Sequence, residues 1–91
     1  MGIKTLRTDP DLTVRLQRGD REAFEEIYRL YAPQLIDFAA GRVEYLDDAR
    51  DIVQDIFISL WANRETLEIT SLPAYLYGAA RYKLVDYLRR N

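Results

Sequence analysis

Hydrophobic positions recur every three or four residues along most of the chain, which is the spacing of one face of an α-helix. The clearest case is the stretch ARDIVQDIFISLW, residues 49–61. One apolar stripe, which we expect to be buried, consists of Ala49, Ile52, Val53, Ile56, Phe57 and Leu60. The opposite side of the same predicted helix carries Asp51, Gln54, Asp55 and Ile58. An isoleucine among acids on that side indicates either an ordinary exposed side chain or the apolar centre of a docking surface.

The same periodicity predicts three further helices, and polar residues mark where each helix begins. Helix caps are expected at Asp9, Asp20, Asp47 and Ser71. The helix after Asp20 has the apolar stripe Phe24, Ile27, Tyr28, Tyr31, Leu35, Phe38 and Ala39. Pro33 lies on the other side of that stripe, and a kink is expected there because the stripe stays in phase across the proline. The last helix runs from about residue 72 to residue 90, with Leu72, Leu76, Ala79, Ala80, Leu84 and Tyr87 facing inward.

No window alternates in the manner of a β-strand, so the predicted fold is all-α, a compact bundle of about four helices. The length of 91 residues is that of a single domain, 1–91, with a short N-terminal tail over residues 1–10. The stretch TLEITSLP interrupts the periodicity and is expected to form a loop before the last helix.

The composition offers little to an enzyme, because the chain has no cysteine and no histidine. Asp51 and Asp55 lie one helical turn apart and could bind a hard cation, but no further ligand is evident and such pairs are common on solvated faces. We therefore expect no catalysis, no metal and no cofactor. No apolar run is long enough to span a membrane and no signal peptide is present, which predicts a cytoplasmic protein.

Charge is unevenly distributed along the chain, although the formal net charge is only −2. Residues 1–70 hold 9 basic and 14 acidic side chains, net −5, whereas residues 71–91 hold 4 and 1, net +3. The difference indicates either two surfaces with different partners or chance unevenness in a short chain, and charge alone leaves both open.

The last predicted helix, YLYGAARYKLVDYLRR, interleaves basic and aromatic residues. Arg81, Tyr82 and Arg89 share its outward face, and Tyr75 and Tyr77 lie in its first turns. Cations neutralise phosphates and aromatic rings stack on unpaired bases, so this pattern suits a strand-separated nucleic acid. The alternative is an amphipathic helix whose basic end complements its dipole and whose tyrosines are in the core.

Taken together, these stretches resemble a known family. DDARDIVQDIFISLW, a loop and LPAYLYGAARYKLVDYLRRN are similar to the second conserved region of bacterial extracytoplasmic-function (ECF) sigma factors. GDREAFEEIYRLYAPQLIDFA resembles the opening helix of that region, so the resemblance covers the chain from about Asp11 onward. Its most specific parts are D-A-x-D-x-x-Q-D-x-F over 48–57 and D-x-x-R-R over 86–90.

The resemblance implies a transcription initiation factor domain that is not an enzyme and has two partners. RNA polymerase core would be bound through the clamp helices of the β′ subunit, with Asp51, Gln54, Asp55 and Ile58 as contacts. Promoter DNA would be recognised at the minus-ten element, where the family opens the duplex and captures a flipped base of the non-template strand. The pocket for that base would be formed by residues 63–71.

The DNA-binding residues implied by the resemblance are Asn63, Arg64, Ser71, Tyr75, Tyr77, Arg81, Tyr82, Lys83, Arg89 and Arg90. Tyr82 departs from the family, which usually has asparagine there, so stacking replaces paired hydrogen bonds to a base edge and the base preference is open. The helix-turn-helix that reads the minus-thirty-five element in full family members has no counterpart in this sequence. An anti-sigma factor is a further expected partner, and the alternative function is a helical module that binds such a protein without touching DNA.

Overall fold

Four helices make up the computed structural model, which describes residues 8–90. They are α2 (Thr8–Gln17), α3 (Arg21–Ala40), α4 (Leu46–Ala62) and α5 (Leu72–Arg90). No strand occurs between residues 8 and 90, which confirms the all-α prediction. Residues 1–7, most of the predicted tail, lie outside the described part of the chain. Because α2 already begins at Thr8, Asp9 lies within this helix instead of capping it.

The turn between α2 and α3 is fixed by side-chain and backbone hydrogen bonds. Gly19 has a φ of 90°, and the N–H groups of Gly19 and Asp20 donate to the carbonyls of Leu16 and Arg15, the Schellman pattern that ends a helix. The Asp20 carboxylate then accepts from the N–H groups of Glu22 and Ala23, which confirms it as the cap of α3. A hydrogen bond from Arg15 holds the pKa of the Asp20 carboxyl below its usual value.

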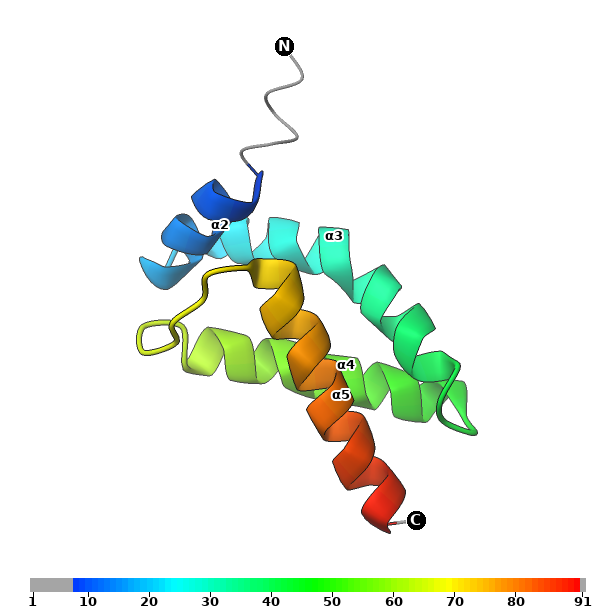
Figure 1. Cartoon of the computed structure of the whole chain (residues 1–91). Coiled ribbons are helices and arrows are strands. Elements are labelled where there is room, and N and C mark those ends of the chain that lie inside the picture. Colours follow the sequence, from blue (N-terminus) through cyan, green and yellow to red (C-terminus); the bar gives the residue numbers. More distant parts are fainter. Residues whose placement is uncertain (1–7, 91) are drawn as a thin grey trace.

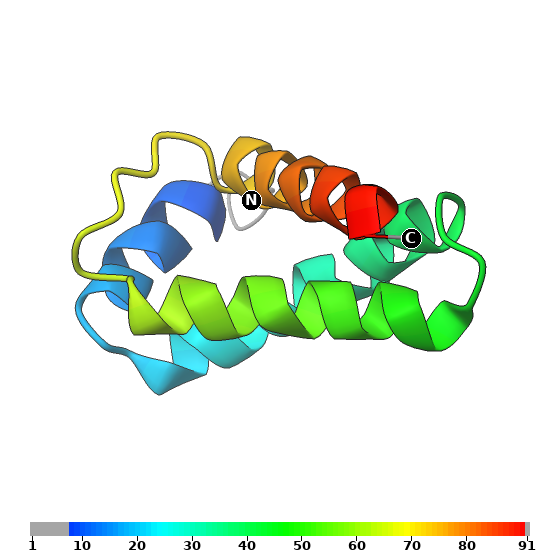
Figure 2. The ribbon, with the colours of Figure 1, turned by 90° about the horizontal axis from the view of Figure 1, so that it is seen from below.

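Helices α3 and α4 run side by side in opposite directions, and α5 crosses over them (Figures 1 and 2). The helix α3 continues through Pro33 to Ala40, and its course bends along its length (Figure 1). The predicted stripe of α4 is buried in full, and from α5 Leu72, Leu76, Ala80 and Leu84 complete the core. The short helix α2 packs against α3 and adds Leu12 and Leu16.

Besides the cap at Asp9, two further predictions about helix faces and ends were wrong. Asp47 does not cap α4, because the helix begins earlier, after Tyr45, and Asp47 lies in its first turn. There it still complements the positive end of the helix dipole. Tyr28, predicted to belong to the buried stripe of α3, is 44% exposed. It lies at the edge of that stripe, where its ring packs at 4.9 Å on the ring of Phe57 but is not covered from outside.

Candidate protein and nucleic-acid interfaces

The four residues predicted to bind polymerase form one exposed ridge on α4. We call Asp51, Gln54, Asp55 and Ile58 the α4 ridge; all four are exposed, and Ile58 is 58% exposed. None of their side chains makes a hydrogen bond or an ion pair within residues 8–90. The buried contacts of the helix come from its opposite face, so these four side chains are available to contact a partner.

An apolar groove runs along one side of the α4 ridge, between α3 and α4. It has a volume of about 400 Å³ and is lined by Phe24, Tyr28, Gln54, Phe57, Ile58, Trp61 and Ala62. Aromatic packing forms its floor, since the rings of Phe24 and Trp61 lie 5.1 Å apart. Gln54 and Ile58 of the ridge thus border an apolar hollow that sequence reasoning did not identify. In the sequence this groove is visible only as aromatic residues in the apolar stripes of two helices, and those residues were predicted to lie in the core.

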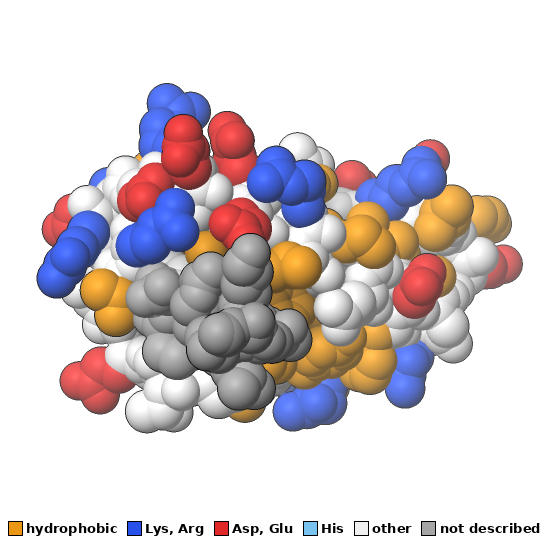
Figure 3. All heavy atoms as spheres, turned by 90° about the horizontal axis from the view of Figure 1, so that it is seen from above, with side chains coloured by type: hydrophobic (Ala, Val, Ile, Leu, Met, Phe, Trp, Pro, Cys, Tyr) orange, Lys and Arg blue, Asp and Glu red, His pale blue; other side chains and the backbone are white. Residues whose placement is uncertain are grey.

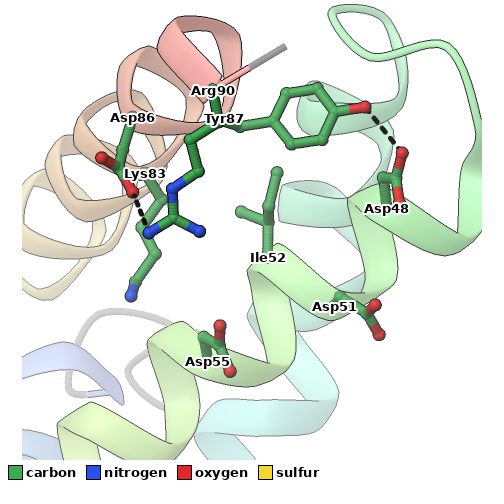
Figure 4. A pocket seen from close by; sticks show the side chains of 8 residues that line it. All are labelled: Asp48, Asp51, Ile52, Asp55, Lys83, Asp86, Tyr87 and Arg90. Carbon is green, nitrogen blue, oxygen red and sulfur yellow. Dashed lines mark hydrogen bonds and ion pairs between the residues drawn. The ribbon is translucent and has the colours of Figure 1, made fainter.

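A charged groove of about 400 Å³ lies on the other side of the ridge, between α4 and α5 (Figure 4). Its lining residues are Asp48, Asp51, Ile52, Asp55, Lys83, Asp86, Tyr87 and Arg90. Arg90 pairs with Asp86 at 3.3 Å, and the Tyr87 hydroxyl donates to Asp48 at 2.6 Å. Lys83 and Arg90, predicted to contact DNA, therefore share a groove with Asp51 and Asp55, predicted to contact polymerase.

The hydrogen bond from Tyr87 to Asp48 joins the C-terminal half of α5 to the start of α4. This bond to a carboxylate, with burial as a smaller cause, raises the pKa of Tyr87 to about 12. The folded pKa lies above the usual value of 10.0, so the stabilisation is fully present below pH 10 and is lost as the pH rises through about 12.

Replacing Tyr87 with phenylalanine is expected to lower the free energy of unfolding at neutral pH, because Asp48 loses its partner. The difference between wild type and Tyr87→Phe should shrink between pH 10 and pH 12, as the wild-type tyrosine ionises. Urea unfolding of both proteins at a series of pH values measures this difference in the free energy of unfolding. A difference that stays constant up to pH 12 would contradict the role given to this bond.

The predicted DNA contacts on α5 do not form one continuous surface. Arg81 lies on the α3 side, in a groove lined also by Phe38, Arg42, Leu84, Val85 and Leu88. Lys83 and Arg90 lie on the α4 side. Tyr82, 77% exposed, and Arg89 line neither groove and face outward. Figure 3 shows the molecule from above, relative to the view of Figure 1. On this face, basic and acidic side chains are mixed with hydrophobic ones, so the face does not present a surface of a single charge.

The predicted contacts at the loop have structural partners as well. Asn63 donates to the Ser59 carbonyl at 3.0 Å and so closes the end of α4. The Arg64 guanidinium lies 4.0 Å from the centre of the Trp61 ring and donates to the Trp61 carbonyl. Ser71 accepts from the N–H of Ala74, which confirms it as the cap of α5.

Tyr75 and Tyr77, in the first turns of α5, are both partly buried. Burial raises the pKa of Tyr75 above its usual value. The Tyr77 hydroxyl donates to Gln34 at 3.2 Å, and the Tyr77 ring meets the Phe38 ring edge-on at 5.3 Å. Both tyrosines thus contribute to packing between α5 and the rest of the domain, as the alternative interpretation of this helix predicted.

A hollow between α2 and the loop is a further concave feature of the predicted DNA-binding region. It has a volume of about 340 Å³ and is lined by Thr13, Val14, Gln17, Ile69, Thr70, Ser71 and Leu72. Figure 2 shows the loop passing α2 on its way from α4 to α5. Three of the lining residues, 69–71, belong to the stretch predicted to form a base pocket, and three belong to α2, which sequence reasoning did not include.

The described part of the chain holds neither a cluster of metal ligands nor a membrane-spanning helix. Among residues 12–90, whose side chains the structure describes, no three acidic, cysteine or histidine side chains come together as metal ligands would. In the same range, no helix has the length and apolar character needed to cross a bilayer. The Asp51 and Asp55 pair therefore has, among the described residues, no third acidic neighbour placed to complete a cation site.

Comparison with known proteins defines the class to which this helical domain belongs. Residues 27–91 match the family model of Sigma-70 region 2, so the chain belongs to the sigma-70 region 2 family, whose members act in transcription initiation. The chain is 25% identical over 72 residues to the RNA polymerase sigma factor YlaC of Bacillus subtilis (strain 168). It is 24% identical over 78 residues to the ECF RNA polymerase sigma factor SigW of the same organism. With these relatives, the chain is a region 2 domain of the ECF sigma factor type.

The two alignments cover 78% and 85% of this chain but 42% of each relative, so the chain spans less than half the length of the relatives it matches. No solved structure matches the chain at a significant level. The helix α2 and the first turns of α3 lie outside the segment matched by the family model.

Proposed function

We propose that this domain docks on the β′ clamp helices of RNA polymerase through the α4 ridge, and that α5 and the loop before it recognise and melt the minus-ten promoter element. The observation that carries the first half is the α4 ridge itself. It presents two acids, a glutamine and an exposed isoleucine that make no polar contact within the described residues, beside an apolar groove. Apolar groups ringed by polar ones are typical of a contact with a partner helix.

The second half is supported by the outward residues of α5 and by the hollow beside the loop. Tyr82 is the most exposed large hydrophobic side chain of the described chain, which suits stacking on an unpaired base. Arg81 and Arg89 lie on either side of it in the sequence, where they would hold phosphates and fix the register of the strand. The relatives, named as RNA polymerase sigma factors, support the same assignment.

A second candidate is a protein-interaction module that binds an anti-sigma factor and does not contact DNA. It is favoured by one observation, the exposed Val85 and Leu88 that line a groove of about 450 Å³ beside Arg81. Exposed aliphatic side chains contribute little to binding a phosphate backbone but much to binding an apolar helix face.

Replacing Arg81, Arg89 and Arg90 together with glutamine separates the two candidates. The proposed function predicts that binding of a strand-separated minus-ten oligonucleotide falls by about 30-fold or more and that the salt dependence weakens, because three phosphate contacts are lost. Binding of a β′ clamp-helix fragment should be retained, since none of the three arginines belongs to the α4 ridge, and Arg90, which lines a groove with Asp51 and Asp55, pairs with Asp86. Fluorescence anisotropy at several salt concentrations measures the first and a pull-down the second. Unchanged oligonucleotide binding would favour the protein-interaction module.

A further inference from the structure

We propose that α2, through Gln17, forms the second wall of the base pocket and holds the loop in the shape that receives an unpaired base. Gln17 is thus inferred to be a positioning residue for DNA recognition. The inference rests on the DNA-binding half of the proposed function and adds to it a helix that lies outside the family match.

The Gln17 side chain ties α2 to the loop across a long stretch of sequence. Its Nε2 donates to the Leu67 carbonyl at 2.6 Å and to the Arg64 carbonyl at 3.1 Å, residues 50 and 47 positions away. Both N–H groups of the amide are used in this way, so a single side chain fixes two peptide groups of one loop. An isolated loop of this length would sample many conformations. Because these two hydrogen bonds already order the loop, they reduce the conformational entropy that it loses when a ligand binds.

The turn that follows α2 supports the same end of the loop. A Cβ atom at Gly19 would lie 3.8 Å from Nε and Nη2 of Arg64, so the guanidinium packs directly over the glycine. The same guanidinium also lies 4.0 Å from the centre of the Trp61 ring. The first half of the loop is thus fixed between α2 and α4, and its second half, residues 69–71, faces α2 across the hollow.

The lining of the hollow suits a base and not a phosphate. None of its seven residues is charged, so a phosphate entering it would lose water without gaining a cation. Val14 and Ile69, which are not buried, provide aliphatic surfaces for the faces of a planar ring. Gln17 Oε1 and the Thr70 hydroxyl have no hydrogen-bond partner within residues 8–90, so both remain for the polar edge of a base.

Titration of the ¹⁵N-labelled 91-residue chain with single-stranded DNA of about eight nucleotides tests this inference. Oligonucleotides of thymine, cytosine and adenine serve as probes, because the promoter sequence need not be known. The expected result is a shift of the backbone amide signals of residues 13–17 and 69–72 with at least one of the three. The Gln17→Ala variant should bind that oligonucleotide about fivefold more weakly or worse, and its loop amides should exchange faster with solvent before DNA is added.

Three further variants make the result specific. Gln17→Glu keeps the size of the side chain but loses both N–H donors, and should behave as Gln17→Ala does. Gln34→Ala is the matched control, because this glutamine of α3 bonds to Leu30 and Tyr77 and does not line the hollow. Thr70→Val, at an exposed position, should weaken the DNA-induced amide shifts of the residues around the hollow without altering the fold. This variant tests the inference if the Gln17 variants do not fold.

The outcomes distinguish this inference from the function on which it rests. Shifts confined to α5, or equal DNA binding by wild type and both Gln17 variants, would overturn the role of α2 and leave the proposed function intact. The absence of any shift with all three oligonucleotides would overturn both this inference and the DNA-binding half of the proposed function. Binding of the β′ clamp-helix fragment should be the same for every variant in this series.

Discussion

Replacing Ile58 with aspartate is expected to weaken binding of a β′ clamp-helix fragment by at least about 30-fold. Ile58 is exposed at the edge of the apolar groove, and a carboxylate placed there must lose its water when a partner helix covers it. Combining Ile58→Asp with Gln54→Ala also removes the polar contact that Gln54 is proposed to make with the partner helix. The double variant should therefore show no binding in a pull-down. The free energy of unfolding should stay within about 1 kcal/mol of wild type, because the side chain is not part of the core.

Leu88→Asp provides the matched control for this prediction. Leu88 is 57% exposed, almost the same as Ile58 at 58%, but lies on α5 away from the α4 ridge. It should leave clamp-helix binding unchanged. A large loss of stability in Ile58→Asp would show that Ile58 is part of the core. Equal loss of binding in both variants would show that the partner recognises exposed apolar side chains in general and not the α4 ridge.

The α4 ridge was predictable because it depends on helical phase alone. Six apolar positions of α4 repeat at helical spacing and all six are buried, so the residues on the opposite face of the helix had to be exposed. The apolar groove beside the ridge was not predictable, because it arises where α3 and α4 meet. Phe24 and Trp61 belong to different helices, and periodicity within one helix says nothing about which ring of a neighbour it will contact.

The same limit explains what was missed around α5 and the loop. The phase of α5 does separate Arg81 from Lys83, but only the packed structure shows that one lies beside Arg42 and the other beside the acids of α4. Gln17 carried no signal at all, since a glutamine at the end of an amphipathic helix is ordinary. Its role depends on carbonyls nearly fifty residues away, and such a contact is decided by how the helices pack.

Replacing Leu76 with alanine is expected to be among the most destabilising changes in the domain. The Leu76 side chain is 0% exposed and belongs to the buried face of α5, a helix that packs on both α3 and α4. Truncating a buried leucine costs about 2–5 kcal/mol, against a total stability of roughly 5–14 kcal/mol for a chain of this length. With about 1 kcal/mol per M of urea for a small domain, the unfolding midpoint should fall by about 2 M or more.

Two probes of the same urea titration test whether α5 is part of a single cooperative core. Trp61, the one tryptophan of the sequence, reports on the α3–α4 contact, whereas circular dichroism reports on all helices. Because α5 buries Leu72, Leu76, Ala80 and Leu84 against both of the other long helices, the two midpoints should fall together. Loss of helical signal before the change at Trp61 would show that α5 unfolds separately. The proposed DNA-binding elements would then unfold while the α4 ridge stays folded. In that case Leu76→Ala would abolish oligonucleotide binding at urea concentrations that leave clamp-helix binding intact.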